Sequence, residues 1–274
     1  MAPERVSLLD DSLIRSYAEN IQRYEFALRY CKGKRVLDAG CGSGYGAQFL
    51  AENGARTVLA LDVSEEAIEE AKRTYRSVNL RFERRDIETL QDDPTLRDQF
   101  DVVVNFENVA HLARPERMIE GVSLLLSTDG TFLISSPNGE ISPLDARGKP
   151  AYKFHHRVYT ASGLRLFVSP YFAQVFMYGQ WLSHAGMLRQ AHAKELFAQL
   201  CEAYYNPMSR IGRAIKRLAG RRMVGPPRFT GATDSFAGDY VIRELESNVF
   251  PWAATVLIAV CNKLHDNRTI TQSN

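Results

Sequence analysis

VLDAGCGSGYG, residues Val36–Gly46, is the stretch that decides the fold. It begins as a short, continuous and largely apolar run, which is typical of a parallel strand buried on both faces of a sheet. Glycine then follows at every second position, and the chain continues into a helical pattern over residues 45–53. Glycine adopts positive φ and lets a ligand approach the backbone, while a helix N-terminus offers unpaired N–H groups. The pattern predicts a ligand site outside the carboxyl end of this strand, where open α/β sheets bind their ligands.

Strand and helix patterns alternate on either side of this stretch. The expected strands are 35–39, 57–62, 80–84, 100–105, 131–135, 171–178 and 254–260, and the expected helices are 45–53, 64–75 and 115–126, with another in the first thirty residues. Such alternation is typical of a parallel sheet with helices on both faces. The sequence therefore predicts a doubly wound, mostly parallel, seven-stranded α/β sheet.

The order loosens after Ser136, and this sets the expected domain organisation. We expect residues 1–178 and 251–264 to form the core and residues 179–250 to form a helical insertion, or cap, before the last strand. Helical patterns within that insertion lie near 182–204 and 208–219, and residues 265–274 are expected to be a C-terminal tail.

Composition narrows the class of protein. The chain has 274 residues, of which 45% are hydrophobic and 24% charged, the balance of an ordinary globular protein. A formal net charge of +2 is too small to imply a nucleic-acid partner. The first residues lack the apolar core of a signal peptide, and the longest apolar run, Phe250–Val260, is too short to span a bilayer as a helix. A cytoplasmic protein is expected.

Two kinds of ligand compete for the glycine turn. Counted from Gly42, the run Gly42-x-Gly44-x-x-Ala47 matches part of the dinucleotide fingerprint, and Asp62 follows at about the distance of a ribose contact. Counted from Asp38, an acidic residue precedes the glycines. Its carboxylate would repel the pyrophosphate of a dinucleotide but would attract an ammonium group. This charge argues against an NAD-dependent oxidoreductase.

The run Asp-x-Gly-x-Gly-x-Gly from Asp38 resembles the first motif of class I S-adenosylmethionine-dependent methyltransferases. The resemblance extends over about residues 20–136 and implies a Rossmann-like fold, S-adenosylmethionine as cofactor and methyl transfer as activity. It assigns an acidic strand-end residue, here Asp62, to the ribose hydroxyls, and places Val63 under the adenine. Segment 23–27 resembles one that lies over the cofactor in related enzymes.

The later strand ends complete the cofactor set that the resemblance implies. Asp86 would lie near the adenine amino group with Ile87 on the ring, and Phe106 would line the sulfonium pocket. Arg23 or Tyr24 would reach the methionine carboxylate, although an ordinary helix face explains both residues equally well. The implied set is Tyr24, Asp38, Gly40, Gly42, Gly44, Asp62, Val63, Asp86, Ile87, Asn105 and Phe106.

Three histidines are candidates for a catalytic base, because a hydroxyl acceptor must lose its proton. His111 follows the fourth expected strand in a segment that resembles the Glu-His-Leu ending of many bacterial members, although Ala110 stands where the acidic residue is common. A loop-stabilising hydrogen bond is the simpler interpretation of His111. His155 and His156 lie in FHHRVYT, residues 154–160, which resembles a segment of methyltransferases that act on bacterial glycans and related small molecules. Val158 replaces the usual acidic residue there, and anchoring of the loop is the alternative role.

Two other possibilities are set aside. Glu107, His111, His155 and His156 could converge on a metal, but they lack the helical spacing that would require one, so no metal is expected. Arginines and apolar residues alternate over 208–228 and could dock on an anionic membrane surface, but we prefer the interpretation of a solvated helix face. No nucleic-acid partner is expected, since neither a second basic patch nor a stacking motif accompanies this segment.

The sequence thus predicts a methyltransferase that moves a methyl group from S-adenosylmethionine to a hydroxyl of a sugar or another small-molecule acceptor. An N-methyltransferase acting on an amino group of a small molecule or peptide is the alternative. An NAD-dependent oxidoreductase and a non-catalytic cofactor-binding module are less favoured.

Overall fold

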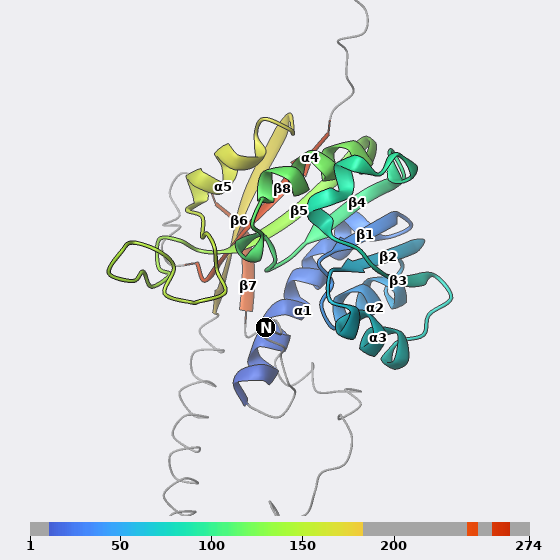
Figure 1. The fold of residues 1–274 in the computed structure, drawn as a ribbon, viewed down its shortest axis with the longest axis horizontal. Coiled ribbons are helices and arrows are strands. Elements are labelled where there is room, and N and C mark those ends of the chain that lie inside the picture. The colour runs from blue at the N-terminus through green and yellow to red at the C-terminus, as the bar shows by residue number, and fades with distance from the viewer. Residues whose placement is uncertain (1–10, 183–239, 246–253, 264–274) are drawn as a thin grey trace, which may run out of the picture. The chain divides into compact units, whose positions relative to one another are not determined.

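The computed structural model describes residues 11–182, 240–245 and 254–263. The predicted α/β architecture is confirmed, because the strands form one mixed sheet with helices on both faces (Figure 1). The chain divides into two units, and the site below belongs to the larger one, Glu19–Trp181 with the described part of Ile242–Asn274. The predicted domain boundaries stay a prediction, and the helical patterns at 182–204 and 208–219 lie outside the described residues.

Eight strands form the sheet in the described residues, in the order β3-β2-β1-β4-β5-β8-β6-β7. They are β1 Arg35–Ala39, β2 Thr57–Asp62, β3 Leu80–Arg84, β4 Phe100–Asn105, β5 Leu126–Pro137, β6 Gln174–Leu182, β7 Tyr240–Glu244 and β8 Val256–Asn262. β1 pairs in parallel with β2 and β4, and β8 pairs antiparallel with β5 and β6. The chain winds outward from β1 to β3 and returns to β4 beside β1. The carboxyl ends of β1 and β4 therefore flank the switch point, where such sheets bind ligands.

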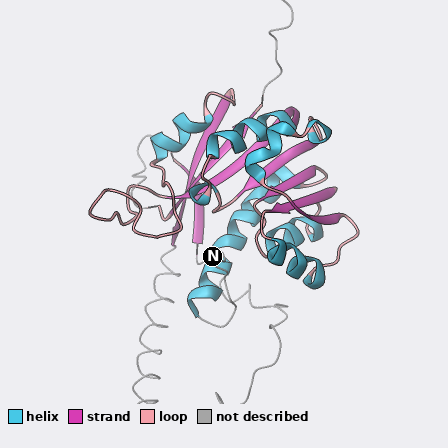
Figure 2. Cartoon of the chain, in the orientation of Figure 1, coloured by secondary structure: helices cyan, strands magenta, loops and turns pink. Residues whose placement is uncertain are grey.

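Helices cover both faces of the sheet, as the helix colouring of Figure 2 shows. They are α1 Asp11–Cys31, α2 Tyr45–Glu52, α3 Glu65–Thr74, α4 Pro115–Leu125 and α5 Ala161–Val168, with short 3-10 helices η1 Ile87–Asp92, η2 Pro94–Leu96 and η3 Val109–His111. Val36 joins the core under α1–α3, and Leu37 joins the core under α4 and α5. Neighbouring residues of β1 thus face opposite cores, which explains why the strand is largely apolar on both faces.

Besides the short 3-10 helices, one strand and one α-helix were not predicted. β7 adds an eighth strand inside the expected insertion, and its exposed Arg243 and Glu244 gave no strand pattern. α5 begins after Thr160, whose hydroxyl oxygen accepts the Gly163 N–H, and it buries only Leu164 and Val168. With only two buried residues, its sequence shows little of a helical apolar pattern. Among the described helices, none is long and apolar enough to cross a membrane.

Candidate functional site

The glycine turn joins β1 to α2 with three glycines at positive φ: Gly40 at 90°, Gly42 at 53° and Gly44 at 84°. A Cβ at Gly44 would lie 2.6 Å from Cε1 of Phe82, so the packing of β3 requires glycine there. A Cβ at Gly42 would meet no atom within 4 Å. Gly42 therefore faces open space that a ligand can use.

Asp62 at the end of β2 holds the turn in place. Its Oδ2 accepts the Gly42 N–H at 2.9 Å, and its Oδ1 accepts the Ser64 N–H at 2.8 Å. A carboxylate oxygen has two lone pairs, so each oxygen can accept one more hydrogen bond. Asp62 can shape the glycine turn and receive two ligand hydroxyls at the same time.

Asp38 is a fully buried carboxylate in β1, one residue before the strand's end. Among the described residues, its hydrogen-bond partner is the Tyr24 hydroxyl, which lies 3.2 Å from Oδ2 and 3.4 Å from Oδ1. Burial raises the pKa of Asp38 to about 7, the Tyr24 hydrogen bond opposes this rise, and the charge of Asp62 adds to it. A buried carboxylate without a cationic partner is stabilised by a bound cation. Asp38 therefore fits a ligand that carries an ammonium group.

Tyr24 extends from α1 over the glycine turn. A Cβ at Gly46 would overlap the Tyr24 ring, so the ring can pack here only because residue 46 is glycine. The ring also packs edge-on against Phe106 and Tyr45, with centroids 5.2 Å and 6.0 Å apart. The structure thus brings together Tyr24, Asp38 and Phe106, three members of the predicted cofactor set.

Asn105 ends β4, next to the end of β1, and is completely buried. Its Nδ2 donates to the Ala39 carbonyl at 2.6 Å and lies 3.3 Å from Asn108 Oδ1. Its Oδ1 is buried without a hydrogen-bond partner among the described residues. Since buried polar atoms are normally paired, this oxygen marks a place for a donor from a ligand.

The remaining predicted cofactor residues lie at the ends of β2 and β3. Val63 is 60% exposed. Asp86 Oδ1 accepts the Glu88 N–H at 2.9 Å and starts η1. Ile87 is packed into the core beneath α4. Contacts of these residues with an adenine ring stay a prediction.

The predicted catalytic histidines gather where the loop before α5 meets η3. His111 Nδ1 lies 3.1 Å from the Phe154 carbonyl oxygen, and the His111 and His155 rings are 4.9 Å apart. His155 also packs edge-on against Tyr152 at 4.6 Å. His156 has an exposed side chain, and its N–H donates to Ala110 at 2.8 Å. The His156 backbone and the His111 ring join this loop to η3, and the roles of the histidines stay a prediction.

A buried polar network around Arg23 was missed by the sequence analysis. Arg23 is 2% exposed and donates to Gln180 of β6 and to Asn20. Glu19 Oε1 lies 3.8 Å from Arg23 Nη1 and accepts the Thr255 hydroxyl at 3.2 Å. Arg23 therefore holds α1 against β6. The signal in the sequence was Gln180, a polar residue within an apolar strand pattern.

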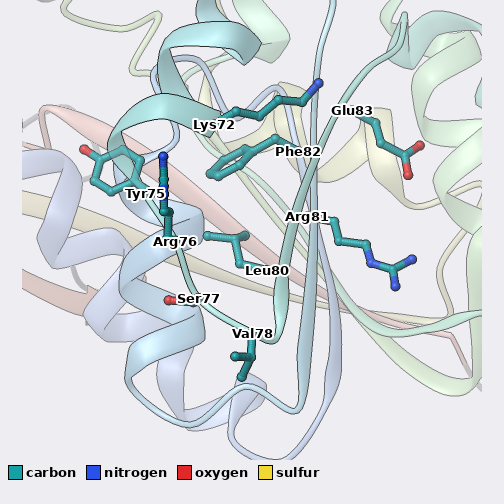
Figure 3. A pocket seen from close by; sticks show the side chains of 9 residues that line it. All are labelled: Lys72, Tyr75, Arg76, Ser77, Val78, Leu80, Arg81, Phe82 and Glu83. Carbon is teal, nitrogen blue, oxygen red and sulfur yellow. The ribbon is translucent and has the colours of Figure 1, made fainter.

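A cavity of about 550 Å³ lies at the outer edge of the sheet, between the end of α3 and β3 (Figure 3). Tyr75 and Phe82 form part of its lining, together with the cationic side chains of Lys72, Arg76 and Arg81. None of the predicted cofactor or catalytic residues lines it. The carboxyl ends of β1, β2 and β4, rather than this cavity, carry the candidate site.

Comparison with known proteins gives a consistent result. A family model described as "Methyltransferase domain" matches residues 31–177. A Mycolicibacterium smegmatis protein named "Probable S-adenosylmethionine-dependent methyltransferase" is 34% identical over 141 residues, which are 52% of each chain. A Coxiella burnetii protein named "Ubiquinone biosynthesis O-methyltransferase" is 36% identical over 109 residues, 39% of this chain and 45% of that one. The chain thus spans about half the length of the curated relatives it matches.

Solved structures share the fold at low sequence identity. An S-adenosylmethionine-dependent methyltransferase from Mesorhizobium loti aligns with a TM-score of 0.51 and 17% identity over 91% of this chain and 99% of that one. The structure described as the [4+2]-cyclase SpnF aligns with a TM-score of 0.55 and 17% identity over 89% and 81%. A phosphoethanolamine N-methyltransferase from Haemonchus contortus aligns with a TM-score of 0.55 and 14% identity over 94% and 59%. At these identities the likeness concerns the fold alone.

Proposed function

The chain belongs to the family of S-adenosylmethionine-dependent methyltransferases, and from this membership we propose that it transfers a methyl group to a hydroxyl of a sugar or another small-molecule acceptor. Family membership implies S-adenosylmethionine as the cofactor. The observation that carries the proposal is Asp38, a fully buried carboxylate beside a glycine that faces open space. A dinucleotide has no ammonium group to offer this carboxylate, whereas the methionine part of S-adenosylmethionine has one.

The residues of the site suit the different parts of this cofactor. Asp38 would accept the ammonium group, Asp62 the ribose hydroxyls, and Asn105 Oδ1 a further donor. Tyr24 and Phe106 supply aromatic rings, which attract cations through their faces and keep water away. When bound, the cofactor supplies an electrophilic methyl group on a positively charged sulfur. Holding an acceptor in line with that methyl group can contribute roughly 7–11 kcal/mol in well-oriented systems.

Fold likeness alone does not supply the activity, since one structure that shares the fold is described as a cyclase. Transfer to oxygen is supported by the Coxiella burnetii relative, whose name is that of an O-methyltransferase. Transfer to an amino group is the second candidate. The Glu107 carboxylate would suit either acceptor. It could act as a base toward a hydroxyl group or as a counter-ion for an amine.

Thermal unfolding of the full chain tests the cofactor. The protein is heated alone and with S-adenosylmethionine, S-adenosylhomocysteine or NAD. A ligand at a hundred times its dissociation constant adds about 2.7 kcal/mol of stability, which is a clear rise in the midpoint. We expect this rise with both sulfur nucleosides and not with NAD. Stabilisation by NAD alone would overturn the proposal.

Turnover tests the reaction. S-adenosylhomocysteine formation is measured with a hexose, a phenol and a primary amine as acceptors. We expect formation above the acceptor-free rate with a hydroxyl compound and a weaker response with the amine. Binding of the cofactor without turnover on any acceptor would instead indicate a non-catalytic binding module.

A further inference from the structure

Glu107 is held by a closed pair of hydrogen bonds to Ser135. The backbone N–H of Glu107 donates to Ser135 Oγ at 2.9 Å, and the same hydroxyl donates to Glu107 Oε1 at 2.8 Å. Ser135 is itself completely buried in β5, which lies beside β4 in the sheet (Figure 1). A rigid strand therefore fixes both the backbone and the carboxylate of Glu107.

The two hydrogen bonds to Ser135 leave one carboxylate oxygen of Glu107 available. Oε1 receives the Ser135 hydroxyl, whereas Oε2 has no hydrogen-bond partner among the residues described. Glu107 has φ of 52°, in the left-handed region that non-glycine residues rarely adopt. The chain thus turns sharply after β4, and Ser135 keeps Glu107 in that conformation.

Glu107 adjoins the aromatic residues of the candidate site. It follows Phe106, whose ring packs on Tyr24, and Tyr24 in turn bonds Asp38. The negative charge of Glu107 contributes to the raised pKa of Glu19 on α1, after burial of Glu19 itself and against the charge of Arg23. Glu107 and Glu19 are therefore close enough for their charges to interact.

The three histidines are less suited than Glu107 to take a proton from an acceptor. His111 Nδ1 lies at hydrogen-bond distance from the Phe154 carbonyl oxygen, and His156 has an exposed side chain and a backbone anchored to Ala110. Their loop packs on η3, at the outer end of the segment that follows β4. Glu107 lies nearer to the strand end and to the aromatic wall of the site.

We propose that Glu107 is the general base that takes the proton from the acceptor hydroxyl, and this inference rests on the proposed function. The acceptor oxygen forms a bond to the methyl carbon, the carbon–sulfur bond breaks with its electron pair going to sulfur, and the hydroxyl proton goes to Glu107 Oε2. The products are the methylated acceptor, S-adenosylhomocysteine and a protonated Glu107. Ser135 is the positioning residue, because it holds Oε1 and turns Oε2 toward the acceptor.

Glu107→Gln tests the base, since glutamine keeps the size of the side chain and an oxygen for Ser135. Glu140→Gln is the matched control, because Glu140 is an exposed carboxyl group in the loop after β5. Three quantities are measured for each variant and the natural chain: kcat against pH with the best hydroxyl acceptor, the dissociation constant of S-adenosylhomocysteine by calorimetry, and that of the acceptor for the S-adenosylhomocysteine complex.

A base contributes about 10²–10⁴-fold to such reactions, so kcat of Glu107→Gln should fall by that factor and lose the acid limb of its pH profile. Both dissociation constants should stay within about threefold, and the control should behave as the natural chain. Retained kcat with an unchanged pH profile would overturn the proposal. A loss confined to KM and to acceptor affinity would do the same, because it would assign Glu107 to holding the acceptor.

The test also works if the acceptor panel yields no substrate. Methyl transfer to water is then followed as methanol and S-adenosylhomocysteine formed without an acceptor, and Glu107→Gln should slow it at least tenfold. An equal rate in the variant would contradict the role of Glu107 as base. Failure of the proposed function is distinguishable, because it would appear in the natural chain as an absence of S-adenosylhomocysteine binding.

Discussion

The two sides of the site are held together by contacts of very different range. On the donor side, defined as Asp38, the glycine turn and Asp62, the hydrogen bonds between different elements join residues 14 and 20 positions apart. On the acceptor side, defined as Glu19, Arg23, Glu107, Ser135 and the histidine loop, the hydrogen bonds between different elements join residues 28 to 236 positions apart. The donor side is thus built within one strand–turn–helix unit and its neighbours. The acceptor side depends on the order of strands across the whole sheet.

This difference suggests that the donor side should respond sharply to single backbone changes. Gly44→Ala combines positive φ with a Cβ pressed against Phe82 and Ala71, so it should cost about 2–5 kcal/mol of unfolding free energy. Gly42→Ala carries only the positive φ and should cost about 1–2 kcal/mol. Urea unfolding measures both. Equal losses would show that packing against β3 is not what requires Gly44.

The Gly44 and Gly42 variants also separate an effect on stability from an effect on ligand binding. Gly42→Ala places its Cβ in the open space of the turn, so it should weaken S-adenosylhomocysteine binding by more than its small loss of stability implies. Calorimetry on the folded variant measures this. Unchanged affinity would mean that the ligand does not approach the backbone at Gly42.

Asp38→Asn removes the charge from the donor side while keeping the shape of the side chain. Hydrogen bonds to charged groups contribute about 1.5–3 kcal/mol, so affinity for S-adenosylhomocysteine should fall by about tenfold to a hundredfold. Without ligand, the variant should be at least as stable as the natural chain near neutral pH, because a desolvated carboxylate has been removed. A destabilised variant with full affinity would show that Asp38 has only a structural role.

The pH dependence of binding follows from the raised pKa of Asp38, about 7 against an ordinary value of 3.8. Between these values the folded chain binds a proton that the unfolded chain has lost, so this group's contribution to stability falls as pH rises through the window. The ammonium group of the ligand needs the ionised carboxylate. Affinity for S-adenosylhomocysteine should therefore rise about tenfold between about pH 6 and pH 8, and calorimetry at both values checks this. Asp38→Asn is the control and should show no such rise.

The smallest effect is expected at the outer rim of the acceptor side. Arg157 and Glu116 form an ion pair at 2.8 Å with both side chains about half exposed. Such pairs contribute about 0–1 kcal/mol, so Arg157→Ala and Glu116→Ala should each change unfolding free energy by less than about 1 kcal/mol. The two variants also test whether Arg157 contacts the acceptor. If Arg157 holds an anionic acceptor, only its own substitution will raise KM.

Particular residues show how much of the fold and of the candidate site could be predicted from the sequence. The apolar run before the glycines predicted β1, and the helix over 64–75 was found as α3, capped by Ser64 as its hydroxyl implies. β7 and α5 were missed because an exposed edge strand and a helix with only two buried residues carry little periodicity. Glu107 was considered only as a metal ligand, since no residue near it in the sequence indicates its hydrogen bonds to Ser135. Among the described residues, no cluster suited to a metal is present.

The sequence by itself determined the α/β architecture, the glycine turn and the two donor-side carboxylates, because strand period, positive φ and the charge at a strand end are local properties. Only the tertiary structure decided that Ser135 clamps Glu107, that Arg23 holds α1 against Gln180 and that His111 meets His155. These contacts exist because β4, β5, β8 and β6 lie side by side. Strand order is set by the packing of both hydrophobic cores at once, and no local stretch of sequence carries that information.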